Sequence, residues 1–129
     1  MAAWRRRLPA DRRAIGTAVE AAASRFLQER GLVPLDANVR YRDGEIDLVM
    51  RDGEVLVFVE VRYRSREDFG GAAASATRGK QKRVIRAATR YLAAHPARAR
   101  LACRFDVVSA DGDPGAPRME WLRAAFDAG

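Results

Sequence analysis

The sequence predicts an α/β fold, in which a mixed β-sheet of about five strands is flanked by helices. Apolar residues recur at three- and four-residue spacing over residues 11–30 and again over 78–94, which indicates two amphipathic helices. Between them, two apolar runs separated by Asp52-Gly53 are typical of a β-hairpin. The resulting order, a helix, three strands, a helix and two strands, is that of a sheet with helices packed on it.

The first half of the chain contains a helix and the first predicted strands. The helix over 11–30 ends at Gly31, because glycine readily adopts the conformation that terminates a helix. A strand is predicted over 33–42 after the break at Pro34, and the hairpin follows over 44–64.

The second half begins with residues 65–77, which we predict to be a mobile loop because they contain Gly70-Gly71. The helix over 78–94 then ends before His95-Pro96. The remaining predicted elements are two strands and one helical turn, over 103–109, 119–122 and 123–127 respectively.

Length and composition indicate one globular domain. The chain has 129 residues, of which 48% are hydrophobic and 32% charged, so we expect one domain over 11–129 preceded by a flexible basic arm over 1–10. No apolar run is long enough to span a membrane, and no secretory signal is recognisable. The single cysteine, Cys103, excludes an intramolecular disulfide. We therefore expect a cytoplasmic protein that does not associate with membranes.

The predicted hairpin brings acidic residues together. With Asp52-Gly53 as its turn, Asp47 faces Phe58 and Glu45 faces Glu60. One face is then apolar and forms the core, with Ile46, Leu48, Met50, Val55, Val57, Val59 and Val61. The opposite face carries Glu45, Asp47, Glu60 and Arg62 at the end away from the turn. Asp47 and Glu60 become diagonal neighbours, roughly 7–8 Å apart at the backbone.

Two carboxylates at that separation can share one divalent cation. Glu60 interrupts an apolar run, where a carboxylate is unfavourable unless it is paired or binds a metal. With the backbone carbonyl of Val61, Asp47 and Glu60 would give an oxygen-rich site suited to Mg²⁺ or Mn²⁺. The alternative is a solvent-facing acidic patch. Glu20, on the first helix, is either brought to this metal or exposed as an ordinary surface glutamate.

The charge of the chain indicates a polyanionic partner. The formal net charge is +7 and the sequence pI about 10.6, which favours nucleic acid over membrane. The phosphate contacts that we expect lie after the hairpin and on the second helix: Arg64, Arg66, Lys80, Lys82, Arg83 and Arg86. For any one of these residues the alternative is an ordinary solvated helix face.

The combined motifs resemble the PD-(D/E)XK nuclease superfamily. These are Glu20 on a leading helix, Gly44-Glu-Ile-Asp47 and Phe58-Val-Glu60-Val-Arg62, and they are especially similar to archaeal Holliday-junction resolvases. More narrowly, residues 11–127 resemble the bacterial YraN-like family, with further matches at Asn38, Phe69-Gly-Gly, Lys80 and Arg104-Phe-Asp-Val-Val. The resemblance implies a restriction-endonuclease-like core in which Asp47 and Glu60 hold the metal and Glu20 fills the helix-borne acidic position. Related resolvases work as dimers, so it also brings a homodimer into consideration.

One residue departs from the superfamily pattern. Active members have a lysine two residues after the glutamate, and here that residue is Arg62, whose guanidinium can stabilise a phosphate but is a poor proton acceptor. Either the metal alone activates water, or Lys80 or Lys82 takes the role, or hydrolysis is weak or absent. The function expected first is a metal-dependent endonuclease acting on DNA, branched DNA included. The alternatives are a nucleic-acid-binding protein on a nuclease scaffold and, third, a module that binds an acidic protein.

Overall fold

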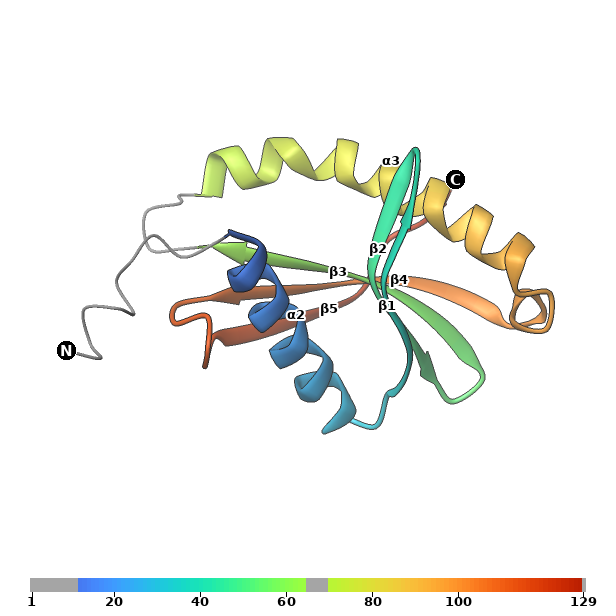
Figure 1. Ribbon diagram of the computed structural model, residues 1–129, viewed down its shortest axis with the longest axis horizontal. Coiled ribbons are helices and arrows are strands. Elements are labelled where there is room, and N and C mark those ends of the chain that lie inside the picture. Colours follow the sequence, from blue (N-terminus) through green and yellow to red (C-terminus); the bar gives the residue numbers. More distant parts are fainter. Residues whose placement is uncertain (1–11, 65–69, 129) are drawn as a thin grey trace.

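The computed structural model confirms the α/β fold, with a five-stranded sheet and two long helices (Figure 1). It describes residues 12–64 and 70–128, and for 70–77 the backbone alone. The predicted arm over 1–10 lies outside these residues. In chain order the elements are α2 (Arg12–Gln28), β1 (Val33–Tyr41), β2 (Gly44–Asp52), β3 (Val55–Arg64), α3 (Gly70–Ala94), the 3-10 helix η1 (Arg98–Arg100), β4 (Ala102–Asp111) and β5 (Arg118–Phe126). None of the described helices is long and apolar enough to cross a membrane.

The sheet is mixed and has the spatial order β1-β2-β3-β4-β5. Strands β3 and β4 are parallel, since α3 connects them as a crossover, and every other neighbouring pair is antiparallel. The two helices cover opposite faces. α2 packs on the face that includes Leu48, Val57 and Val59, whereas α3 packs on the face that includes Leu56 and Phe58. The sequence analysis identified only the first of these two buried faces.

The predicted hairpin register is wrong by two residues. Asp52 pairs with Val55 and Leu48 pairs with Val59, so the turn is Gly53-Glu54 and not Asp52-Gly53. Gly53 has a φ of 62° and supplies the positive φ at the first central position, as in a type II′ turn, whereas the prediction assumed a type I′ turn. A shift of two residues preserves the alternation of side chains. Ile46 is an exception to the predicted face, because it packs with Val49 and Phe58 against α3 and not with Leu48 against α2. The shift also brings Asp47 to the level of Glu60.

Two further predicted boundaries are corrected. Residues 65–69 of the predicted loop lie outside the described residues, but α3 begins at Gly70, eight residues before the predicted start. The alanines over 72–76 favour helix strongly enough to outweigh the two glycines before them. The predicted helical turn over 123–127 is instead the end of β5, which the stacking of Phe126 on Phe105 holds to the sheet.

The beginning of β2 lies directly against α3. A Cβ atom on Gly44 would come within 2.1 Å of the backbone oxygen of Arg83, so only glycine permits this approach. The close contact fixes the middle of α3 over the β1–β2 hairpin. It therefore determines where the basic side chains of α3 stand relative to the acidic strands.

Candidate functional site

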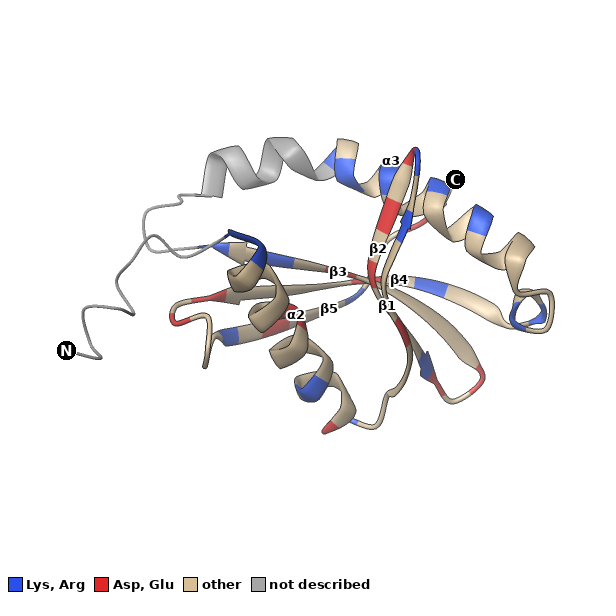
Figure 2. Ribbon diagram, viewed as in Figure 1, with Lys and Arg blue, Asp and Glu red and all other residues tan. Residues whose placement is uncertain are grey.

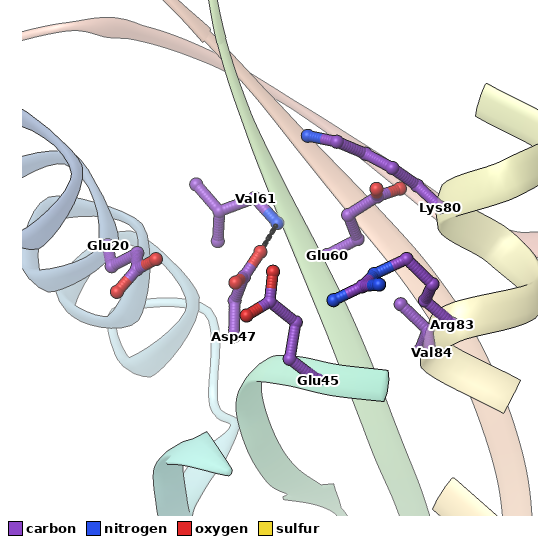
Figure 3. Close-up of a pocket in the computed structure, with 8 residues that line it drawn as sticks. All are labelled: Glu20, Glu45, Asp47, Glu60, Val61, Lys80, Arg83 and Val84. Carbon is purple, nitrogen blue, oxygen red and sulfur yellow. Dashed lines mark hydrogen bonds between the residues drawn. The ribbon is translucent and has the colours of Figure 1, made fainter. Parts of the chain in front are cut away.

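A pocket of about 320 Å³ lies between α2 and α3, at the end of β2 and β3 away from their turn (Figure 3). Its acidic lining comes from α2 and the two strands, and its basic lining comes from α3. The lining residues are Glu20, Glu45, Asp47, Glu60, Val61, Lys80, Arg83 and Val84. Three of the four residues predicted to be catalytic therefore share one cavity, and the fourth, Arg62, does not line it.

Asp47 occupies a gap in the backbone pairing of the sheet. On one side the β1–β2 pairs pass from Ala37–Leu48 to Val39–Ile46, and on the other the β2–β3 pairs end at Leu48–Val59. The Asp47 carboxylate accepts a hydrogen bond of 2.8 Å from the backbone N–H of Val61. Burial raises the pKa of Asp47 above its ordinary value, opposed by this hydrogen bond, while the charges of Glu45 and Glu60 raise it further.

Glu60 is buried, with 3% of its surface exposed. Its Oε2 accepts hydrogen bonds of 3.2 and 3.1 Å from Nε and Nη2 of Arg62. Its Oε1 has no hydrogen-bond partner in the described part of the chain. Because a buried carboxylate oxygen without a donor is costly, this atom is where the protein lacks a positive or hydrogen-bonding group.

Glu20 reaches the pocket from α2, on the side of Asp47 opposite to α3 (Figure 3). Burial raises the pKa of Glu20 to about 7, and the charge of Asp47 raises it in the same direction. The charge of Arg40 and the polar side chain of Asn38 lower it.

The predicted phosphate contacts separate into two groups. Lys80 and Arg83 line the pocket from α3, and the charge of Lys80 lowers the pKa of Asp47. Lys82 and Arg86 are exposed on α3 outside the pocket lining, along the basic stretch visible in Figure 2. Arg64 is half-buried at the end of β3, away from the lining, and Arg66 lies outside the described residues.

The residues present fit a hard divalent cation, although no dense ligand cluster is formed. Among the described residues, no three of His, Cys, Asp and Glu are grouped so that they could hold a metal. Two carboxylates that line one pocket, with one oxygen lacking a donor, are the hard oxygen ligands that Mg²⁺ and Mn²⁺ prefer. The N–H of Val61 is used by Asp47, so any metal contact of Val61 would come from its carbonyl, as expected.

The sequence analysis did not include Glu45, Asn38 or Gly44 among the site residues. Glu45 lines the pocket, and its place on the acidic face of the hairpin was a usable signal. The approach of α3 to Gly44 is a contact between distant residues, which no local sequence pattern predicts. Asn38 adopts a positive φ within a strand, which no pattern in the sequence indicates.

Comparison with known proteins places the chain among bacterial relatives. Residues 19–110 match the family described as "Uncharacterised protein family UPF0102". A UPF0102 protein of Xanthomonas campestris is 55% identical over 119 residues, 92% of this chain and 96% of that protein. UPF0102 proteins of Alkalilimnicola ehrlichii and Aeromonas hydrophila are 51% and 52% identical, and they align with 93% and 86% of this chain and over 92% and 83% of their own lengths. The expected YraN-like relationship is thus confirmed, and the chain belongs to the UPF0102 family.

Proposed function

We propose that this protein is a metal-dependent endonuclease that hydrolyses phosphodiester bonds in DNA, branched DNA included. The observation that carries the proposal is Oε1 of Glu60, a buried oxygen without a donor in the described residues, in a pocket that Asp47 also lines. A divalent cation would remove the cost of burying this oxygen and the repulsion between the two carboxylates. Mg²⁺ or Mn²⁺ is the cofactor that this chemistry favours.

The roles of the acidic residues follow from their contacts. Asp47 and Glu60, with the carbonyl of Val61, would hold the ion, which when bound stabilises charge on the phosphate and lowers the pKa of a coordinated water. The N–H of Val61 fixes the Asp47 carboxylate, and Arg62 fixes that of Glu60. Glu20 would support the site from α2, since it lines the same pocket as Asp47.

The basic residues of α3 would bring the phosphate into an otherwise acidic pocket. Lys80 and Arg83 are three residues apart on a helix, so they lie on the same side of α3, and both line the pocket. They would hold the reacting phosphate. Lys82 and Arg86, together with Arg64, would contact neighbouring phosphates without reading the base sequence. Arg66, expected to do the same, lies outside the described residues.

The pocket lining also distinguishes the two lysines as substitutes for the superfamily lysine. Lys80 lines the pocket and Lys82 does not. The guanidinium of Arg62 is bound to Glu60 and remains protonated at any working pH. Lys80 is therefore the lysine that we expect to contribute to turnover.

A second candidate function is a nucleic-acid-binding protein that retains the nuclease scaffold without turnover. The observation that favours it is the ion pair between Arg62 and Glu60, 3.1 Å long, which already neutralises part of the charge that a metal would neutralise. Both functions require the basic surface of α3. Metal binding and product formation separate them. A homodimer is compatible with either function.

The decisive experiment combines Mn²⁺ and Mg²⁺ titrations with cleavage assays on linear, flapped and four-way DNA. Asp47→Asn and Glu60→Gln each remove one charge at nearly constant size. Glu54→Gln, an exposed change in the turn of the same hairpin, is the matched control. For an endonuclease, metal binding and cleavage are lost in the first two variants and retained in the third. DNA binding without metal, and without products under either ion, would instead leave the second function.

Three substitutions test the roles assigned to the basic side chains. Lys80→Gln should lower cleavage at least about tenfold, because it removes a charge that faces the reacting phosphate. Lys82→Gln should leave cleavage at saturating DNA unchanged and reduce the salt dependence of DNA affinity by about one phosphate contact. Arg62→Lys should raise cleavage if the arginine limits turnover. An affinity for DNA that does not change with salt would contradict the phosphate contacts.

A further inference from the structure

The helix α3 has a packed part and a part that stands off the sheet. Its buried residues, among the side chains that the structure describes, all follow position 83: Val84, Ala87, Ala88 and Tyr91. None of residues 78–83 is buried, and all of them except Gln81 are exposed. The close contact between Gly44 and the backbone of Arg83 lies at the boundary between the two parts (Figure 1). The pocket, and not a packed core, therefore lies beneath residues 78–83.

The part of α3 that stands off the sheet carries cations and no anions. Arginine and lysine occur six times on α3, and no acidic residue occurs on it. Arg90 is the only one of these six that pairs with a carboxylate in the described part of the chain, that of Asp43. Cations four residues apart repel one another, and Gly79 weakens the helix by about 1 kcal/mol relative to alanine. A helical segment that is polar all round and lacks favourable pairs needs a partner, which here has to be anionic.

These cations lie on two opposite sides of the helix. Successive residues of an α-helix are about 100° apart, so Lys82 lies about 200° around α3 from Lys80. Arg78 and Lys82 are four residues apart and share one side; neither lines the pocket, and we call them the outer cations. Lys80 and Arg83 both line the pocket, and we call them the pocket-side cations. The two pairs are separated by the body of α3, which is about 10–12 Å across with its side chains.

We propose that α3 enters the major groove of B-form duplex DNA, where the pocket-side cations contact the phosphates of one strand and the outer cations those of the other. The major groove is about 12 Å wide and admits an α-helix. Phosphates line both of its edges, so a helix with cations on opposite sides is complementary to it. A helix that followed a single backbone would need its cations on one side. Cleavage of the strand at the pocket rests on the proposed function, whereas binding of the duplex does not.

The competing explanation is that the basic surface of α3 attracts any nucleic acid. Three duplexes of one sequence and length distinguish the two explanations: plain DNA, DNA whose cytosines carry a glucosylated 5-hydroxymethyl group, and RNA. The added sugar fills the major groove, and the major groove of A-form RNA is deep and narrow. All three duplexes carry the same number of phosphates, so attraction by charge alone gives similar affinities.

Affinities are measured for the full-length protein in EDTA, which prevents metal-dependent cleavage. We expect the glucosylated DNA and the RNA to bind at least about tenfold more weakly than plain DNA, because α3 cannot enter their major grooves. Similar affinities for all three duplexes would overturn the proposal.

Two double variants test whether both sides of α3 take part. In the first, Arg78→Gln is combined with Lys82→Gln. In the second, Lys80→Gln is combined with Arg83→Gln. Each should lower the slope of log affinity against log salt concentration on plain DNA by about 1.8, since each phosphate contact contributes about 0.9. A lower slope in only one of the two variants would mean that α3 contacts a single backbone, and the proposal would fail.

Arg25→Gln combined with Arg100→Gln is the matched control, because both residues are exposed, lie on α2 and η1, and carry the same total charge. The control should leave the slope unchanged. A fall as large as that of the α3 variants would be an effect of net charge and would count against the proposal. Groove binding without cleavage under Mg²⁺ or Mn²⁺ would remove the proposed function and leave this inference intact. Undiminished binding and cleavage of the glucosylated DNA would do the reverse.

Discussion

Two buried carboxylates on neighbouring parallel strands have opposite hydrogen-bonding states. Asp106 on β4 is completely buried, and its two oxygens accept four hydrogen bonds, from Nε and Nη2 of Arg104, Nε1 of Trp121 and the N–H of Ala124. Glu60 on β3 is almost as buried, yet only its Oε2 is bonded, to Arg62. Each carboxylate has an arginine two residues away, Arg62 after Glu60 and Arg104 before Asp106, and is bonded to it.

The difference separates a structural carboxylate from one in the candidate site. All four hydrogen bonds that the Asp106 carboxylate can accept come from donors of the protein itself, two of them in β5. Asp106 therefore holds β5 to β4. Glu60 retains an unmet oxygen that lines a pocket with other charged groups. An incomplete set of partners at a buried charge is thus the mark of the candidate site.

The largest effect is expected for Asp106→Ala. Removing this carboxylate leaves the guanidinium of Arg104 and the indole N–H of Trp121 without a shared partner, and breaking a buried ion pair typically costs about 3–5 kcal/mol. The free energy of unfolding from urea titrations measures the loss. A loss below about 1 kcal/mol would mean that the four hydrogen bonds are not structural.

Gly44→Ala should affect the pocket that Glu60 lines and leave the surroundings of Asp106 unchanged. The added Cβ would meet the backbone oxygen of Arg83 at 2.1 Å, so α3 has to move, at a cost of about 1–3 kcal/mol. Lys80 and Arg83 should be displaced from the pocket with it. Crystallography and DNA affinity would record the displacement, while the contacts of Asp106 should remain as they are. If α3 kept its position in Gly44→Ala, the contact with Gly44 would not be what fixes α3 over the hairpin.

Glu60→Gln should change the stability of the metal-free protein by less than about 1 kcal/mol, in contrast to Asp106→Ala. The substitution weakens a largely buried ion pair with Arg62 but also removes a buried charge, and these effects oppose each other. Addition of Mn²⁺ should raise the melting temperature of the wild type and not that of the variant. Equal stabilisation of both proteins would show that the ion binds elsewhere.

The smallest effect is a pH dependence of stability that depends on Glu20. Its pKa is raised from 4.5 to about 7 in the folded protein, so the folded state binds more protons between these values than the unfolded state does. This contribution is complete below about pH 4.5 and is lost as the pH rises through 7. Urea titrations at pH 5 and 7.5 should show a fall in stability that Glu20→Gln reduces. Glu29→Gln, an exposed change just after α2, should retain it.

Much of the fold follows from local sequence patterns. The spacing of apolar residues in 12–28 gives the stripe that buries Val19, Ala23 and Leu27. Alternation in the hairpin assigns its side chains to faces whichever turn forms, with Ile46 as an exception. The same alternation placed Glu45, Asp47 and Glu60 together before any coordinates. Alternation does not determine the register of the hairpin, because Asp52-Gly53 and Gly53-Glu54 both allow a tight turn. Only the pairing of the whole strands decides between the two turns.

The sequence by itself determined that acidic side chains of β2 and β3 would share a face and that a basic helix would follow them, since strand alternation and helix periodicity are local properties of the chain. Tertiary structure alone decided which of these charges meet. Lys80 and not Lys82 lines the pocket, Glu20 of α2 lines it together with Asp47 of β2, and Asp106 has a full set of hydrogen bonds while Glu60 does not. Such outcomes depend on how α2, α3 and β5 pack on the sheet, and packing sums contacts between residues far apart in the sequence.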